Sequence, residues 1–299
     1  MAVPVSSTSN AASCATDGPV RAEIQPGHRD ANSENFPVAS FLLPRRIRSH
    51  VLAFYRFARA ADDIADSTDL SPSEKVAALD RLADVLDGAT PSDAAGAAAA
   101  AHRASLKATG VSDRHGRDLL QAFRRDAANP RCADWDDLMA YCRLSAASVG
   151  RYLIDLNGED PSAYAASDAL CAALQVLNHL QDLQDDLLAL DRVYLPLDWV
   201  AEEGAVIDDL RRGTLTPAMR RVVDRCLDAT DLLLAEAASL PGALGRSRLR
   251  YEAAVILTVA ERLSRKLRDN DPLASRVALS RSARLCCLAQ GLARAVAAR

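Results

Sequence analysis

The chain of 299 residues is 49% hydrophobic and 25% charged, and its formal net charge of −4 excludes an overall basic protein that binds nucleic acid or an anionic membrane. No run of about 18 apolar residues predicts a membrane span, and no basic start followed by an apolar stretch predicts a secretory signal. The seven cysteines lack C-x-x-C spacing and the five histidines lack metal-ligand spacing, which indicates buried thiols in a reducing, cytoplasmic compartment.

The chain divides into a tail and one domain. Residues 1–30 are rich in Ser, Thr, Ala and Asn and show no periodicity, which predicts a disordered tail. Residues 31–299 form the expected catalytic domain. We therefore expect a single folded unit after the tail.

Helices are predicted throughout this domain. Ser71 and Glu74 form a capping box that starts one helix, and Asp134 and Asp160 are placed to cap others. The predicted helices cover residues 72–88, 90–110, 134–158, 160–191, 215–238, 246–268 and 273–298. Because no segment alternates with period two, we expect about eight to ten helices and no sheet.

A polar stripe is expected on the predicted helix over residues 51–66. Tyr55, Arg59, Asp62 and Asp66 follow one another at spacings of four, three and four, so they share one helix face. The other faces carry apolar side chains. By itself, this pattern fits a solvated surface helix as well as a functional site.

A second stripe repeats the pattern over residues 172–186. Gln175, Asn178, Asp182 and Asp186 lie at spacings of three, four and four on a helix that is apolar over most of its circumference. Such a helix is expected to be buried. Unpaired buried carboxylates are very costly, so a bound cation is expected there.

The two stripes together predict a Mg²⁺-dependent diphosphate site. Paired carboxylates are hard oxygen ligands that suit Mg²⁺, which keeps several waters and bridges protein to phosphate oxygens. Two stripes that face each other across a cavity could hold a cluster of such ions around a departing diphosphate. Arg59 and Tyr55 are placed to donate hydrogen bonds to the diphosphate, and the apolar walls leave a dry pocket for a prenyl tail.

Small side chains fill a third segment, which runs from Tyr141 to Gly150 with the sequence Y-C-R-L-S-A-A-S-V-G. Close helix packing explains this stretch as well as a functional role does. In the functional interpretation, the small residues leave room for a hydrocarbon chain beside Tyr141.

In this order and spacing, the three segments resemble the squalene/phytoene synthase family. The resemblance covers residues 32–198 and continues more weakly to the C-terminus. The first aspartate-rich motif of the family is matched by residues 59–66, R-A-A-D-D-I-A-D, and its central helix by Tyr141 with Val149-Gly150. The second motif and its follow-on are matched by residues 175–196, Q-V-L-N-H-L-Q-D-L-Q-D-D-L-L-A-L-D-R-V-Y-L-P.

The resemblance implies an all-α, single-domain isoprenoid synthase fold with a central cavity. The residues that would hold two or three Mg²⁺ ions are Asp62, Asp66, Asp182 and Asp186, with Asp63, Asn178 and Asp185 as neighbours in the motifs. The residues that would bind the diphosphate and its metal are Tyr55, Arg59, Gln175 and Asn178. Tyr141 and Arg192 would complete the pocket, and Tyr141 would be catalytic together with the four motif aspartates.

Within the family, two segments resemble the bacterial hydroxysqualene synthases of hopanoid-type squalene pathways. One is residues 34–44, and the other is residues 177–182, in which Gln181 stands where phytoene and squalene synthases commonly have arginine. Such an enzyme ionises presqualene diphosphate, rearranges the cyclopropylcarbinyl cation and lets water quench it to hydroxysqualene. No Gly-rich dinucleotide fingerprint is present, so we expect no NADPH. Asn32-Ser33 stands where relatives often have His-Ser, which leaves one diphosphate contact open.

Several alternatives stay open on the sequence alone. The same aspartates would serve a presqualene diphosphate, squalene or phytoene synthase that joins two prenyl diphosphates, such as farnesyl diphosphate, head-to-head. A chain-elongating prenyltransferase relies on lysines, and the three lysines here lie away from both motifs. A non-enzymatic helical scaffold with solvated acidic faces would show no Mg²⁺ dependence. Peripheral contact with a membrane and transfer of product to other squalene-pathway enzymes also stay open.

Overall fold

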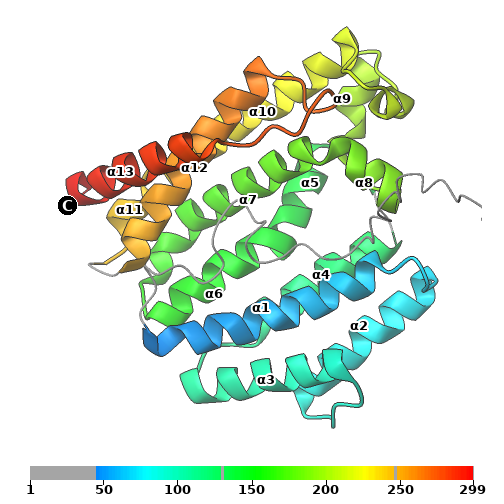
Figure 1. Ribbon diagram of the computed structural model, residues 1–299. Coiled ribbons are helices and arrows are strands. Elements are labelled where there is room, and N and C mark those ends of the chain that lie inside the picture. Colours follow the sequence, from blue (N-terminus) through cyan, green and yellow to red (C-terminus); the bar gives the residue numbers. More distant parts are fainter. Residues whose placement is uncertain (1–44, 129–130, 246–247, 299) are drawn as a thin grey trace, which may run out of the picture.

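The computed structural model describes residues 45–128, 131–245 and 248–298 (Figure 1). These residues are almost entirely helical, which confirms the all-α fold class. The predicted tail over residues 1–30, Asn32-Ser33 and the segment 34–44 lie outside the described residues. None of the described helices combines the length and the apolar character that crossing a bilayer requires.

Thirteen α-helices occur in the described residues. The helices of the first half are α1 (Arg45–Asp66), α2 (Pro72–Asp87), α3 (Ala94–Thr109), α4 (Arg114–Ala128), α5 (Trp135–Cys142) and α6 (Ser148–Asn157). Those of the second half are α7 (Tyr164–Gln181), α8 (Leu183–Leu190), α9 (Leu197–Glu202), α10 (Pro217–Ala237), α11 (Leu240–Ala243), α12 (Arg248–Asp269) and α13 (Arg281–Ala297). Short 3₁₀ turns cover Pro161–Ala163 and Ile207–Arg211.

The capping geometry confirms the predicted helix starts at Ser71 and Asp134. The Ser71 side chain accepts a hydrogen bond from the Glu74 backbone N–H, and the Glu74 carboxylate accepts one from the Ser71 backbone at 2.8 Å. Asp134 caps α5 by accepting a hydrogen bond from the Asp137 backbone N–H at 2.8 Å. These contacts satisfy backbone donors that have no partner inside the helix.

Two predicted helices are interrupted. A π-helical segment, Arg143–Ala147, separates α5 from α6 within the predicted helix 134–158. The predicted helix 160–191 breaks at Asp182, whose φ of −108° and ψ of 14° lie outside the helical range. The predicted helix 273–298 begins only at Arg281, after an irregular connector.

The expectation of no sheet is wrong. Strand β1 (Arg131–Cys132) pairs in parallel with β2 (Val193–Pro196), and the register is irregular between Arg131 and Cys132. Strand β1 has only two residues, and all four residues of β2 are buried, so neither strand alternates between apolar and polar residues in the sequence. The pair joins the end of α4 to the chain that follows α8.

Two hydrophobic clusters form the core. Helices α1, α2, α3, α4 and α6 enclose the first, which includes Phe57, Leu79 and Leu120. The second is larger and gathers around α7, which packs against α6, α10 and α12 (Figure 1). This central position of α7 agrees with the expected burial of the second stripe, because Val176, Leu177, Leu180 and Leu183 are buried and Leu174 is half-buried.

Candidate active site

The first aspartate-rich segment occupies the last turns of α1. Arg59 donates hydrogen bonds to Asp62 at 2.6 Å and to Asp63 at 3.2 Å. Tyr55, Arg59, Asp62 and Asp66 are partly buried, whereas Asp63 is exposed. Asp63 borders a groove between α1 and the start of α3, together with Tyr55 and Arg59. Asp63 is therefore more exposed to solvent than Asp62 and Asp66, although Arg59 contacts both Asp62 and Asp63.

The carboxylates of this segment are crowded. Burial, with a contribution from the nearby Asp66 carboxylate, raises the pKa of Asp62 to about 7, although Arg59 and Arg192 oppose the shift. The two arginines thus do not offset the cost of burying this carboxylate next to Asp66. The donors are hard carboxylate oxygens, so the residues present fit a divalent cation such as Mg²⁺.

Arg192 connects the two aspartate-rich segments. It follows α8 and donates one hydrogen bond to the Asp66 carboxylate at 2.6 Å and another to the Ala65 backbone carbonyl at 2.9 Å. Its side chain is buried. The predicted pocket residue therefore ties the end of the second segment to the end of α1.

Asp126 of α4 is a central acceptor that sequence reasoning missed. Tyr141 donates a hydrogen bond to one oxygen of its carboxylate at 2.9 Å, and Tyr194 of β2 donates one to the other at 3.0 Å. Burial raises the pKa of Asp126, although Arg192 and both tyrosine hydroxyls oppose the shift. The hydrogen bonds fix both buried tyrosine rings. No motif includes Asp126 and none of the predicted helices covers it, so no signal in the sequence marked this residue.

The second segment lies beside this cluster. His179 stacks on the Tyr194 ring with 3.7 Å between the ring centroids, and its Nε2 lies 3.2 Å from Nε2 of Gln175. The other ring nitrogen of His179 lies 3.9 Å from the Asp186 carboxylate. Asn178 is half-buried on the same helix, one turn before Asp182. The predicted residues Gln175 and Asp186 are therefore joined through His179.

Asp182 is buried at the break between α7 and α8, and Asp185 is exposed. The Asp182 carboxylate lies 3.7 Å from Arg276, which belongs to the connector between α12 and α13. The neighbouring Gln181 is buried and donates a hydrogen bond to the Val277 carbonyl of the same connector. Gln181 therefore holds the segment that places Arg276 next to Asp182.

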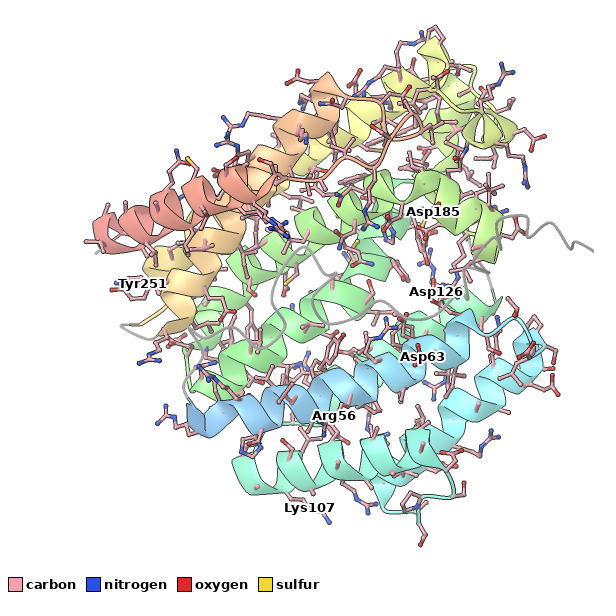
Figure 2. All side chains as sticks on the ribbon, viewed as in Figure 1. Arg56, Asp63, Lys107, Asp126, Asp185 and Tyr251 are labelled. Atoms are coloured by element: carbon pink, nitrogen blue, oxygen red, sulfur yellow. The ribbon has the colours of Figure 1, made fainter. Side chains whose placement is uncertain are left out.

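One polar network thus joins α1 to α8. Its members are Asp66, Arg192, Asp126, Tyr141, Tyr194, His179, Gln175 and Asp186. Figure 2 shows Asp63, Asp126 and Asp185 toward the same side of the molecule, where α1 ends. Across the described ranges, no three His, Cys, Asp or Glu side chains converge closely enough to hold a metal by themselves. Mg²⁺ commonly takes its remaining ligands from water and phosphate, so the metal assignment stays a prediction.

In the third segment, at least Gly150 serves the packing of α6 against α7. A Cβ atom on Gly150 would lie 2.6 Å from the Cys171 sulfur and 2.6 Å from the Ser167 hydroxyl of α7. Gly150 therefore lets α6 and α7 approach closely. Leu144, Ser145 and Ala146 lie in the π-helical segment and are partly buried. The room for a hydrocarbon chain beside Tyr141 stays a prediction.

Comparison with known proteins shows similarity to squalene/phytoene synthases over most of the chain. The family model of squalene/phytoene synthases matches residues 29–283. A hydroxysqualene synthase of Sinorhizobium fredii is 42% identical over 254 residues, which cover 85% of each chain. A phytoene synthase of Rhodobacter capsulatus is 34% identical over 218 residues, which cover 69% of this chain and 61% of the phytoene synthase.

A solved structure supports the fold directly. The crystal structure of squalene synthase HpnC from Alicyclobacillus acidocaldarius superimposes with a TM-score of 0.67 at 30% sequence identity. The match covers 78% of this chain and 87% of that chain. The helices described above therefore have the arrangement of an isoprenoid synthase.

Proposed function

Because the chain belongs to the squalene/phytoene synthase family, we propose that it converts presqualene diphosphate to hydroxysqualene and diphosphate in a Mg²⁺-dependent reaction. The observation that carries the proposal is the 42% identity with a hydroxysqualene synthase over 254 residues, against 34% with a phytoene synthase. Enzymes of this family act on prenyl diphosphates. In this proposal, the residues of the polar network between α1 and α8 would contribute to the binding of such a substrate.

In this proposal, the motif carboxylates bind the metal. Asp62 and Asp66 from α1 would hold Mg²⁺ together with Asp182 and Asp186, with Asp63, Asn178 and Asp185 nearby. The bound ions would stabilise the negative charge of the departing diphosphate. Asp62 fits this role because burial and the nearby Asp66 carboxylate raise its pKa, and a bound cation would favour its ionised form.

The other polar residues position these groups. Arg192 fixes Asp66 and the end of α1 through its two hydrogen bonds, so the first motif keeps its distance from the second. Tyr55, Arg59, Gln175 and Asn178 would orient the diphosphate through donor groups. Preorganised donors of this kind cost no reorganisation when the C–O bond breaks.

The buried aromatic rings would serve the cation. Tyr141 and Tyr194 are held by Asp126, and His179 stacks on Tyr194. Aromatic faces attract positive charge, and the attraction is strongest where water is excluded. We assign the final bond to water, which attacks the rearranged cation and loses a proton to leave the hydroxyl group of hydroxysqualene.

A substrate assay tests this function. The purified chain with Mg²⁺ is given presqualene diphosphate in one reaction and farnesyl diphosphate in another. We expect hydroxysqualene and diphosphate from the first substrate and no product from the second. In ¹⁸O-labelled water the hydroxyl oxygen should carry the label, and added NADPH should leave the product unchanged.

Three outcomes would contradict the proposal in different ways. Conversion of farnesyl diphosphate to presqualene diphosphate would identify a head-to-head condensing enzyme. Formation of squalene only when NADPH is added would identify a reductive enzyme. No product from either substrate, with no change in melting temperature on adding Mg²⁺ and diphosphate, would favour a scaffold, because a ligand that binds the folded state raises its stability.

A further inference from the structure

Helix α13 presents an apolar face that no described element covers. Leu285, Leu288 and Val296 are 67%, 39% and 49% exposed. Leu292 is half-buried between them, so the four side chains follow spacings of three, four and four along one side of the helix. Scattered single leucines on a surface are ordinary, but a continuous row on one helix is not.

The packing of α13 does not explain this row. The helix packs mainly on α12, along its outer side (Figure 1). Its buried face consists of Cys287, Gly291 and Ala295, spaced four residues apart. A Cβ atom on Gly291 would lie 2.5 Å from the Val255 Cα atom, so small residues already bring the two helices into close contact. The exposed leucines are therefore not needed to pack α13 against α12.

The charge around this row is positive. Helix α13 contains three arginines and no acidic residue. Arg294 is paired with Glu261 at 2.7 Å, whereas Arg281 and Arg284 in the first turn are exposed. Cations in the first turn are unfavourable for the helix dipole, so helix stability does not account for them.

This positive region is unlike the rest of the chain. Residues 246–299 contain 12 lysines and arginines against 4 acidic residues, a net charge of +8. The remaining residues contain 24 basic and 36 acidic residues, a net charge of −12. The C-terminal region is therefore basic, although the net charge of the whole chain is negative. In addition, the match to the family ends at residue 283, so most of α13 lies beyond it.

We propose that α13 docks the protein on an anionic lipid surface. In this arrangement, Leu285, Leu288, Leu292 and Val296 enter the boundary between headgroups and acyl chains, while Arg281 and Arg284 contact lipid phosphates. A helix that combines an apolar face with basic residues binds membranes in this way, and it needs no spanning segment. A second copy of the chain is a poorer partner, because paired α13 faces would bring arginines together with no acidic residue on the helix.

Vesicle co-sedimentation of the full chain tests the docking. Vesicles of phosphatidylcholine alone are compared with vesicles of equal parts phosphatidylcholine and phosphatidylglycerol. We expect binding to the anionic vesicles, weakening as salt is raised. The double variant Leu285→Gln/Leu288→Gln should lower the apparent partition coefficient by about tenfold or more. Arg281→Gln/Arg284→Gln should lower it by a similar factor at low salt.

Matched controls separate this surface from general effects. Leu232→Gln changes a leucine that is 75% exposed on α10, and Arg81→Gln removes an exposed arginine on α2; both should bind like the parent chain. Melting temperatures show that the variants are folded. Undiminished binding by the leucine variant, or no binding of the parent chain to anionic vesicles, would overturn the proposal. So would a dimer in solution that the leucine variant dissociates. Binding to vesicles is measured without substrate, so the outcome is independent of the proposed reaction.

Discussion

The two aspartate-rich segments keep the same residue spacing but differ in backbone and in partners. The first lies on the unbroken helix α1, and its carboxylates pair at 2.6 Å with Arg59 and Arg192. The second bends at Asp182, and its carboxylates have Arg276 at 3.7 Å and His179 at 3.9 Å. The first segment thus has a cation on its own helix, Arg59, and one from the chain after α8, Arg192. The second has His179 on its own helix and Arg276 from the connector before α13.

The bend does not destroy the shared face. The Asp182 backbone N–H donates to the Asn178 carbonyl at 3.0 Å, and the Asp186 N–H donates to the Asp182 carbonyl at 2.8 Å. Hydrogen bonds between residues four apart therefore continue through the break. The comparison shows that four-residue spacing can hold carboxylates in register on a straight helix and on a bent one.

The largest effect is expected when either segment loses a carboxylate. Asp62→Asn and Asp182→Asn should each lower turnover by about 100-fold or more, because each removes a proposed metal ligand. Folding stability should change by less than about 1 kcal/mol, since neither residue supplies a core packing contact. Steady-state kinetics and denaturant unfolding measure the two effects.

The exposed neighbours serve as matched controls for this comparison. Asp63→Asn and Asp185→Asn should lower turnover by less than about tenfold, because both side chains are exposed beside the proposed ligands. Full activity of either Asp62→Asn or Asp182→Asn would show that the ligands are assigned wrongly. Equal losses at all four positions would show that exposure does not distinguish the ligands.

An intermediate effect is expected for the arginine that links the segments. Arg192→Met should lower the free energy of unfolding by about 3 kcal/mol, because it leaves Asp66 and the buried Asp126 without their cation. Arg59→Met breaks an ion pair within one helix and should cost less than about 1 kcal/mol. Urea unfolding of both variants gives the difference. Equal losses would mean that Arg192 is no more important to the fold than a surface arginine.

A smaller loss of stability than that of Arg192→Met is expected at the centre of the network. Asp126→Asn keeps one acceptor oxygen and turns a donor toward one of the two tyrosines, so unfolding should become easier by about 1 kcal/mol. Tyr141→Phe removes the hydroxyl group that donates this hydrogen bond to Asp126. A double-mutant cycle of the two should give a non-zero interaction energy, since the groups are in contact. Strict additivity would contradict a shared network.

The sequence was sufficient to predict features that depend on the geometry of a single helix. The faces formed by Asp62 with Asp66 and by Asn178 with Asp182 follow from residue spacing alone, and so do the caps at Ser71 and Asp134. The helical fold was predictable for the same reason, since nearly every segment repeats its apolar residues with helical period.

The sequence was insufficient where distant segments meet. Asp126 and Arg276 lie outside the motifs, and their partners come from other elements that only tertiary packing brings together. The break at Asp182 was missed because its flanking residues keep helical periodicity. Strand β1 was missed because it has only two residues, and β2 because it is buried at every position and does not alternate. Their pairing also depends on the position of α4.

The link between Arg192 and Asp66 has a consequence for biosynthesis. The two residues are 126 positions apart in the chain. At ribosomal rates of about 5–20 residues per second, Asp66 is made roughly 6–25 seconds before its arginine. During that interval the nascent N-terminal half carries an acidic helix end without its counter-charge. The first motif therefore takes its final form only after the second has been synthesised, so the candidate site is assembled late in the synthesis of the protein.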